Sequence, residues 1–139
     1  MSRIPFCSDY NVINVTELED KYEVLAEVAE PATHCVHCNH EEIVGFGRRR
    51  EVIVDTPVNG KRTYIMLNRR RYRCKSCRRT FLECVQHKHN RRQMTHGLIK
   101  YIAHECLQRP FTHVADDVGV DEKTIRNIVS DHASTKNTR

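Results

Sequence analysis

The cysteines carry the clearest chemistry in this sequence of 139 residues. Four of the seven stand in two pairs, with two residues between the partners of each pair: Cys35 with Cys38, and Cys74 with Cys77. A tight turn directs both thiolates of such a pair toward one metal ion, and two turns complete a tetrahedral set. Four protein ligands leave no position for water, so the spacing predicts a structural Zn²⁺ site and not a catalytic one. Metal binding and folding should then be coupled.

The sequence leaves other uses of these residue types open. Two Cys-x2-Cys pairs also suit an iron site of the rubredoxin type, although a redox protein has no evident need for many basic residues. Of the three remaining cysteines, Cys7 and Cys106 are most simply small apolar fillers. One histidine near the first pair could replace a cysteine; the candidates are His34, His37 and His40. A second, incomplete ligand set is formed by Cys84, His87 and His89.

The net charge of +5 is unevenly distributed along the chain. Residues 1–44 hold 2 basic and 9 acidic residues, residues 45–92 hold 15 and 3, and residues 93–139 hold 6 of each. A dense basic segment predicts a surface that binds a polyanion, whereas the alternative is a solvated basic face without a partner. The predicted phosphate ligands in this segment are Arg48, Arg49, Arg50, Arg69, Arg70, Arg71 and Arg73.

Alternating apolar residues predict β-structure around both cysteine pairs. The pattern predicts a β-hairpin in residues 11–28, which leads into Cys35, and a second β-hairpin in residues 51–67. Asn59-Gly60 is its turn, because both residues tolerate the positive φ of a type I′ turn. This second hairpin would bring together two cysteine pairs that are separated by 35 residues. Gly45–Gly47 reads as a flexible joint, and residues 80–82 as one more short strand.

After residue 93 the spacing of the apolar residues changes from that of a strand to that of a helix. Met94, Leu98, Ile102 and Cys106 recur every four residues, which predicts one apolar stripe on a helix. Two shorter helices should follow. We expect the three helix N-termini to be capped by Thr95, Thr112 and Asp121.

The last two helices have the spacing of a helix-turn-helix. Ala115 is the small residue where the helices cross, and Gly119, four residues later, suits a left-handed turn. Six residues further on, Ile125 returns an apolar side chain to the shared core. The second helix would enter the major groove of DNA, although a three-helix bundle for protein interaction is the alternative. The residues expected to contact DNA are Lys123, Thr124, Arg126 and Asn127; Arg126 suits guanine and Asn127 suits adenine.

These elements predict an α+β chain: a β-rich four-cysteine zinc ribbon with β-hairpins, followed by a three-helix helix-turn-helix domain. The expected boundaries are 1–83 for the ribbon, 84–93 for a linker, 94–133 for the helices and 134–139 for a disordered tail. The sequence has no apolar run of membrane-spanning length and no signal-peptide pattern. We therefore expect reduced cysteines in a cytoplasmic, nucleoid-associated protein of a prokaryote, and no membrane partner.

With these features in order, nearly the whole chain resembles the N-terminal part of insertion-sequence transposases of the ISL-three group. The resemblance rests on the acidic hairpin, on the two cysteine motifs and on the helix-turn-helix. Their residues are Cys35-Val36-His37-Cys38, the arginine-rich strand into Tyr72–Phe81, Pro110-Phe111, Val114-Ala115 and Gly119–Arg126. One departure is Asn39, which stands where such knuckles often have glycine; asparagine tolerates the same left-handed conformation.

In that family the ribbon and helix-turn-helix precede a catalytic domain of RNase H-like fold, which uses an Asp-Asp-Glu set to cut DNA. No residue of this chain maps onto those carboxylates. The resemblance therefore implies a protein that binds the terminal inverted repeats as double-stranded DNA without cutting them and holds Zn²⁺ as a structural cofactor. It also leaves open a dimer or a larger transposase oligomer.

Two other functions fit the same residues. A stand-alone helix-turn-helix transcriptional regulator would use the same DNA chemistry at a promoter. A zinc-ribbon protein-interaction adaptor would instead bind a protein partner through the acidic N-terminal hairpin. A salt titration separates the adaptor from the others, because phosphate contacts make affinity fall steeply with salt.

Overall fold

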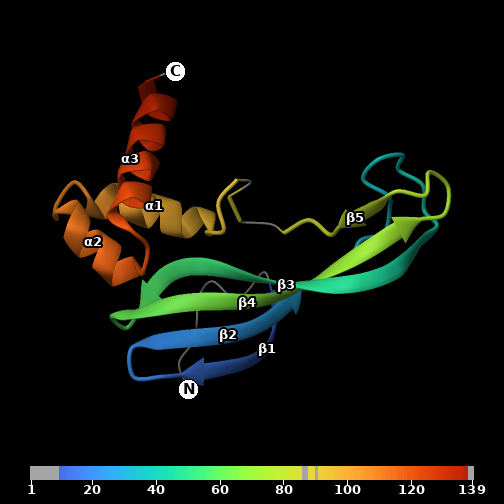
Figure 1. Cartoon of the computed structure of the whole chain (residues 1–139), viewed down its shortest axis with the longest axis horizontal. Helices are drawn as coiled ribbons and strands as arrows, with labels where there is room; N and C mark the ends of the chain where they lie inside the picture. Colours follow the sequence, from blue (N-terminus) through green and yellow to red (C-terminus); the bar gives the residue numbers. More distant parts are fainter. Residues whose placement is uncertain (1–9, 86–87, 90, 138–139) are drawn as a thin grey trace. The chain divides into compact units, whose positions relative to one another are not determined.

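The computed structural model describes residues 10–85, 88–89 and 91–137, and in them a β-sheet precedes three helices (Figure 1). The strands are β1 (Tyr10–Glu17), β2 (Lys21–Val28), β3 (Ile43–Val58), β4 (Lys61–Cys74) and β5 (Thr80–Leu82). The helices are α1 (His96–Glu105), α2 (Phe111–Val118) and α3 (Glu122–Asn137). The strand order is β1-β2-β4-β3, and β5 pairs with β4. The predicted α+β class, with its β-rich part first, is confirmed.

Two hairpins build the sheet, as the sequence predicted. Between β1 and β2, the Leu18 N–H donates to the Lys21 carbonyl at 2.8 Å. Between β3 and β4, Asn59 and Gly60 have φ values of 53° and 74°, which the type I′ turn requires. The alternation on β2 places its apolar side chains on the covered face, where Tyr22, Val24 and Ala26 are buried.

The described residues form two compact units, and the four long strands contribute to both. We call them the ribbon unit, with residues 10–15, 24–52 and 65–85, and the helical unit, with residues 16–23, 53–64, 88–89 and 91–137. This division differs from the expected boundaries, which assigned residues 1–83 to one domain and 84–93 to a linker. The turn of the β3–β4 hairpin instead belongs to the same unit as the helices.

Backbone pairing explains why the hairpin turn groups with the helices. The Val54 N–H donates to the Gln93 carbonyl at 2.9 Å, and the Thr95 N–H donates to the Val54 carbonyl at 3.1 Å. Residues at the end of the expected linker therefore pair with β3 through one isolated parallel bridge, Val54 with Met94. The pairing joins segments about 40 residues apart through backbone atoms alone. The periodicity of side chains in the sequence therefore does not reveal it.

A buried carboxylate strengthens this junction. Asp55 is 2% exposed, and its Oδ1 accepts a hydrogen bond from the Thr95 hydroxyl at 2.6 Å and from the Thr56 N–H at 2.7 Å. Burial raises the pKa of Asp55, although both hydrogen bonds act in the opposite direction. Thr95 in turn accepts a hydrogen bond from the Leu98 N–H at 3.1 Å and so caps α1. One side chain thus connects β3 to the start of the first helix.

The three helices share one apolar core. Its buried members come from all three helices and from the segment before them: Met94, Leu98, Ile102, Val114, Ala115, Val118, Ile125 and Ile128. Cys106 is half-buried and packs against this cluster, as expected for a small apolar filler. The other cysteine given that role, Cys7, lies outside the described residues.

Two of the three expected helix caps are present. Thr95 caps α1, and the Asp121 carboxylate accepts a hydrogen bond from the Thr124 N–H at 2.8 Å at the start of α3. The predicted cap by Thr112 is wrong, because α2 already begins at Phe111. Pro110 occupies the cap position with φ −59°, and it makes no side-chain hydrogen bond there. Proline is suited to a helix start because its φ is already close to the helical value.

Two further expectations differ from the structure. Gly45–Gly47 was expected to be a flexible joint but lies inside β3, where Gly47 adopts a φ of 96°. The tail expected to be disordered from residue 134 instead continues α3 as far as Asn137, since each added residue extends an existing helix at little cost. None of the helices in the described part of the chain is long and apolar enough to cross a membrane.

We predict that Gly119→Ala lowers the free energy of unfolding by about 1–2 kcal/mol, because a left-handed residue with a Cβ costs roughly that amount. Gly119 has a φ of 90°, and an added Cβ would lie 2.6 Å from Tyr64 Oη and 2.8 Å from Arg62 Cδ. Urea unfolding measures the loss. Gly45→Ala is the matched control, because its Cβ would meet nothing within 4 Å and its φ is ordinary. Equal losses in both variants would contradict the assigned turn geometry.

Candidate metal centre and nucleic-acid interface

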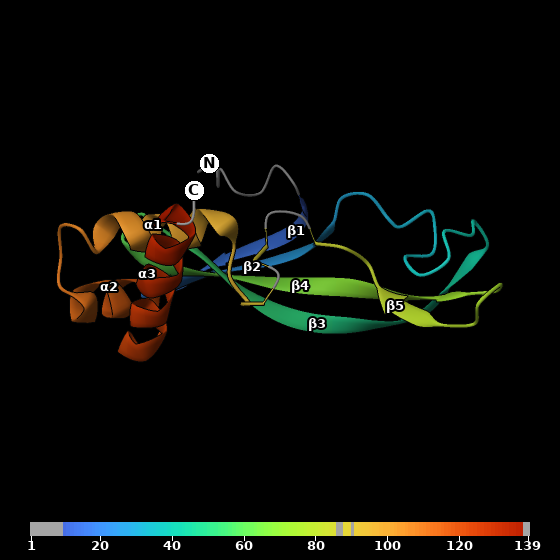
Figure 2. The same ribbon diagram turned by 90° about the horizontal axis from the view of Figure 1, so that it is seen from above.

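The two cysteine pairs meet at one end of the ribbon unit. One pair lies on the loop before β3. In the other pair, Cys74 ends β4 and Cys77 lies on the loop between β4 and β5; Figure 2 shows these loops. The sulfurs of Cys35 and Cys77 are 3.6 Å apart, those of Cys38 and Cys74 are 3.5 Å apart, and all four lie within 4.8 Å of one another. A tetrahedral zinc ion with Zn–S bonds of about 2.3 Å would separate its sulfurs by about 3.8 Å. The four thiols therefore fit Zn²⁺ closely.

The two loops share the same backbone conformation and the same pattern of backbone hydrogen bonds. In the first, Asn39 N–H donates to the Cys35 carbonyl at 2.9 Å; in the second, Arg78 N–H donates to the Cys74 carbonyl at 3.0 Å. Each first cysteine sulfur also accepts a backbone hydrogen bond at 3.3 Å, from His37 or from Ser76. Asn39 and Arg78 are both left-handed, with φ values of 64° and 63°. We call these loops the first and second knuckles, residues 35–40 and 74–79.

The backbone hydrogen bonds prepare the thiols for metal binding. Burial alone would raise the pKa of Cys35, but hydrogen bonds from the backbone of Cys38 and His37 lower it to about 6. Hydrogen bonds from the backbone of Cys77 and Ser76 lower the pKa of Cys74. A backbone hydrogen bond from Arg79 acts in the same direction on Cys77, but burial and the neighbouring thiols raise its pKa to about 11. Full deprotonation of the cluster therefore needs a cation.

The helices reproduce the predicted helix-turn-helix. Gly119 is left-handed, and its N–H donates to the Ala115 carbonyl at 2.9 Å, which ends α2. Ala115 and Ile125 are both buried in the shared core. On the opposite side of α2, the Asp117 carboxylate accepts hydrogen bonds from Tyr101 Oη at 2.7 Å and from Arg109 Nη2 at 3.1 Å. These contacts tie α2 to α1 and to the segment between them.

The start of α3 presents the expected side chains to solvent. Lys123, Arg126 and Asn127 are exposed, while Thr124 is half-buried. Arg126 forms an ion pair with Glu122 one turn earlier on the same helix. Within the described residues, Lys123 and Asn127 form no ion pair or side-chain hydrogen bond, and Lys123 interacts electrostatically with Asp121. This face can therefore offer donors and acceptors to the edges of base pairs.

Two family models match the chain. Residues 31–77 match the zinc-finger of transposase IS204/IS1001/IS1096/IS1165, and residues 90–133 match the helix-turn-helix domain of transposase family ISL3. The chain carries the DNA-binding region of an ISL3-group transposase. Zinc is the structural cofactor of this region, as both the four-cysteine cluster and the zinc-finger match support. No curated protein and no solved structure matches the chain.

The histidines near the first knuckle of this transposase region are engaged elsewhere. His40 Nδ1 accepts a hydrogen bond from the Glu42 N–H at 3.1 Å, and His37 Nε2 lies 3.3 Å from the Thr80 carbonyl oxygen. His34 Nδ1 lies 2.8 Å from the Thr33 hydroxyl. Among the residues that the structure describes, only the four cysteines group as metal ligands. The second ligand set considered above includes His87, which lies outside the described residues.

Two of the arginines predicted to contact phosphate are internal. Arg70 Nε donates to both carboxylate oxygens of Glu83 at 3.0 and 3.1 Å, and its Nη2 donates to the Val28 carbonyl at 2.7 Å. Arg69 Nε donates to the Glu83 carbonyl at 2.6 Å, and its Nη1 lies 3.3 Å from Glu51. The side chains of Arg69 and Arg70 are only 20% and 21% exposed. Both therefore support the ribbon fold, and the contact with phosphate that the sequence predicted for them stays a prediction.

The other predicted arginines divide into paired and unpaired groups. Arg48 forms an ion pair with Glu27 at 2.9 Å, and Arg49 forms one with Glu51 at 3.7 Å. Within the described part of the ribbon unit, no acidic partner is found for the remaining three: Arg50, Arg71 and Arg73. Arg50 and Arg73 are exposed, and the Arg73 guanidinium lies over the Phe46 ring at 5.7 Å. The arginines of the basic segment thus differ in whether an acidic side chain pairs with them, a difference that the sequence alone does not reveal.

Sequence reasoning missed Glu83, which organises the internal arginines. Its side chain is 2% exposed and is held by Arg70. A signal was present, because Glu83 is the only acidic residue between positions 56 and 104. A single carboxylate in a long basic segment is a candidate for a buried counterion. The exposed cations of the second knuckle were also absent from the predicted site: Lys75, Arg78 and Arg79.

Removal of one knuckle thiol should release the metal. We expect Cys74→Ser to lose zinc and to unfold the ribbon unit, because zinc binding contributes roughly 10–16 kcal/mol in zinc-finger peptides. A colorimetric zinc assay and far-UV circular dichroism measure the two effects. Cys84→Ser is the matched control, because Cys84 is exposed and lies outside the four-cysteine cluster. A folded Cys74→Ser chain with full zinc content would refute this ligand set.

Loss of Arg70 should act on stability. We expect Arg70→Ala to lower the free energy of unfolding by about 3 kcal/mol, because Glu83 would remain buried without its partner. The double variant Arg70→Met with Glu83→Leu should recover most of the loss, since it removes both charges. Urea unfolding of the zinc-loaded chain gives these values. Arg48→Ala, at an exposed ion pair, should cost less than about 1 kcal/mol, and a loss as large as that of Arg70→Ala would contradict the assignment.

Proposed function

We propose that this chain binds the terminal inverted repeats of its transposon as double-stranded DNA. The observation that carries the proposal is the helix-turn-helix of transposase family ISL3, in which the start of α3 is exposed and polar. Recognition helices of this class place their N-terminal residues in the major groove. The ends of a transposon are the sequence that a transposase must find. They are therefore the most direct target for such a helix.

Four residues of α3 carry base and phosphate recognition in this proposal. Arg126 reads guanine through a bidentate contact, and Asn127 reads adenine. Thr124 and Lys123 contact phosphate or a neighbouring base edge. Arg126 must exchange Glu122 for the base, and this exchange costs little because an exposed pair at this spacing contributes only about 0.3–0.5 kcal/mol.

The ribbon supplies the phosphate contacts that the helical segment lacks. Residues 45–92 have a net charge of +12, whereas residues 93–139 have none. Arg50, Arg71 and Arg73 are the members of the predicted set without an acidic partner in the described residues, and we assign phosphate contacts to them first. Arg48 and Arg49 can contribute only by releasing Glu27 and Glu51. Contacts of this kind give affinity that depends on salt and not on sequence.

The metal has a structural role in this scheme. We assign all four cysteine thiolates as its ligands, which leaves zinc no open position for water or substrate. The described residues would therefore bind DNA without cutting it. Thiolate ligands also require reducing conditions, which fits a protein that acts on the chromosome in the cytoplasm.

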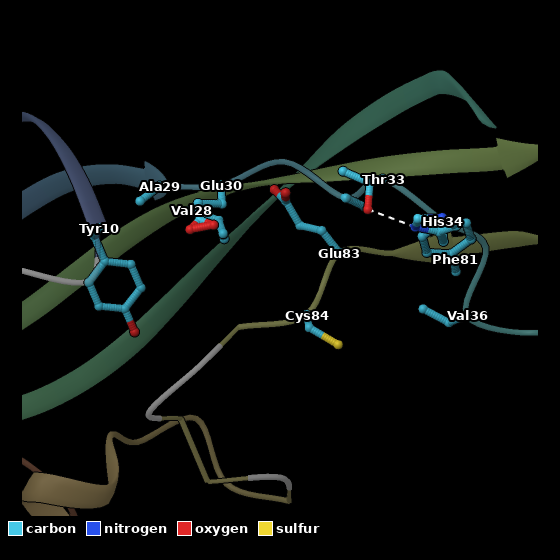
Figure 3. A pocket seen from close by; sticks show the side chains of 11 residues that line it. Tyr10, Val28, Ala29, Glu30, Thr33, His34, Val36, Phe81, Glu83 and Cys84 are labelled. Atoms are coloured by element: carbon cyan, nitrogen blue, oxygen red, sulfur yellow. Dashed lines mark hydrogen bonds between the residues drawn. The ribbon is translucent and has the colours of Figure 1, made fainter. Parts of the chain in front are cut away.

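A protein-interaction adaptor is the second candidate, and a cavity in the ribbon unit favours it. The cavity has a volume of about 410 Å³, and its walls include Tyr10, Val28, Val36 and Phe81 (Figure 3). Val36 is 56% exposed, so an apolar side chain of a partner could cover it. The acidic hairpin formed by β1 and β2 is a separate candidate surface for such a partner, because most of its acidic residues lie in residues 16–23 of the helical unit. A transcriptional regulator remains the third candidate, and only the identity of the DNA site distinguishes it.

One selection experiment tests the proposal. The zinc-loaded chain is incubated with a random pool of duplex DNA at near-physiological salt, and bound sequences are determined for the unmodified chain and for Arg126→Ala. We expect one enriched motif that matches the inverted repeats, and we expect Arg126→Ala to lose preference at a guanine by about 1–3 kcal/mol. A promoter motif would favour the regulator. No enrichment would reject sequence-specific recognition.

Arg50→Ala serves as the contrast in the same selection. It should weaken binding to all sequences alike, because a phosphate contact carries no sequence information. The enriched motif should therefore remain unchanged. If Arg126→Ala and Arg50→Ala changed the motif in the same way, the division between base reading and phosphate binding would be wrong.

A further inference from the structure

We propose that the second knuckle is itself a phosphate-binding element, in which Lys75, Arg78 and Arg79 contact the DNA backbone. This inference rests on the proposed function, because it assigns additional ligands for the same DNA. None of these three residues belongs to the arginine set that the sequence analysis selected. The case depends on three observations: their lack of acidic partners, the rigidity of the loop and the conformation of Arg78.

The first observation concerns charge. Lys75, Arg78 and Arg79 are exposed, and no ion pair or side-chain hydrogen bond involves them within the described residues. By contrast, acidic partners already occupy Arg48, Arg49, Arg69 and Arg70. No acidic side chain of the described residues neutralises these three cations. Four thiolates with one Zn²⁺ carry a net charge of −2, so the centre and the three cations together keep a net positive charge. An unneutralised group of cations binds polyanions and releases their counterions.

The second observation is that hydrogen bonds fix the backbone that carries these cations. Arg78 N–H donates to the Cys74 carbonyl at 3.0 Å, and Cys74 N–H donates to the Arg79 carbonyl at 3.0 Å. Lys75 N–H donates to the Glu42 carbonyl at 2.9 Å, which ties the knuckle to the segment before β3. Two of the four cysteines stand within this loop. A charged loop held in this way loses little entropy when it binds phosphate.

The third observation compares the two knuckles. Asn39 and Arg78 occupy the same position and have the same left-handed backbone, with φ values of 64° and 63°. Asparagine tolerates this conformation well, whereas a long side chain pays roughly 1 kcal/mol for it. Stability alone would therefore favour asparagine or glycine at position 78. The first knuckle carries no lysine or arginine between residues 35 and 40, so the added charge distinguishes the second knuckle.

These observations favour the DNA backbone as the ligand. The three cations lie within five residues, and the chain already carries a DNA-binding helix-turn-helix. Lysine and arginine on a loop contact phosphate without reading bases. The contribution to affinity should therefore be the same for every DNA sequence, and it should be lost as salt rises.

The test is Arg78→Asn in the full zinc-loaded chain, with duplex DNA that carries the selected motif and with unrelated duplex DNA. We expect unchanged zinc content and unchanged or greater resistance to urea, because asparagine suits the backbone. Affinity for both duplexes should fall about threefold to tenfold, and the salt slope of log K should fall by about 0.9. The triple variant Lys75→Gln, Arg78→Asn and Arg79→Gln should lower that slope by about 2.7 if each residue contacts one phosphate.

Arg48→Gln is the matched control, because it removes one exposed charge that Glu27 already neutralises. It should change affinity less than Arg78→Asn does. The inference is overturned if the unmodified chain binds DNA and the triple variant binds equally well, or if affinity falls only together with zinc loss. If the unmodified chain shows no salt-sensitive DNA binding, the proposed function fails as well. The two failures are thus distinguishable.

Discussion

Mutual repulsion between thiolates is the constraint on which the ribbon depends. Four cysteine sulfurs within 4.8 Å of one another cannot all be ionised unless a cation neutralises them. Backbone hydrogen bonds favour the thiolates of Cys35 and Cys74, but the pKa of Cys77 rises to about 11 beside its neighbours. Zinc resolves this conflict, and it also fixes both knuckles. The order of the loop that carries Lys75, Arg78 and Arg79 therefore follows from the metal.

A second constraint is the placement of arginine in a sheet with few acids. Burial of a guanidinium requires a carboxylate partner, and Glu83 and Glu51 serve that purpose for Arg70 and Arg69. The arginines left over remain free for an external anion. In the proposed function the basic segment would thus perform two tasks with one residue type, and the local supply of carboxylates would decide which task each arginine has.

Features encoded over a few residues could be predicted from the sequence: the two Cys-x2-Cys pairs, the Asn59-Gly60 turn and the left-handed Gly119. Each depends on local backbone conformation. Features that depend on distant partners could not be predicted. The pairing of Val54 with residues 93–95 and the ion pair of Arg70 with Glu83 join segments whose proximity only the folded sheet creates. The Thr112 cap failed for a local reason, because Pro110 already starts the helix.

The charge pattern suggests how affinity and specificity are divided along the chain. Residues 93–139 have no net charge, so α3 gains little from general attraction to DNA. Its Arg126 is paired with Glu122, which further reduces binding to phosphate without a matching base. A recognition helix without net charge distinguishes well between DNA sequences, because a wrong base leaves the polar groups of the helix unpaired. Such a helix needs attraction from elsewhere, and in the proposed function the unpaired cations of the ribbon would provide it without favouring any sequence.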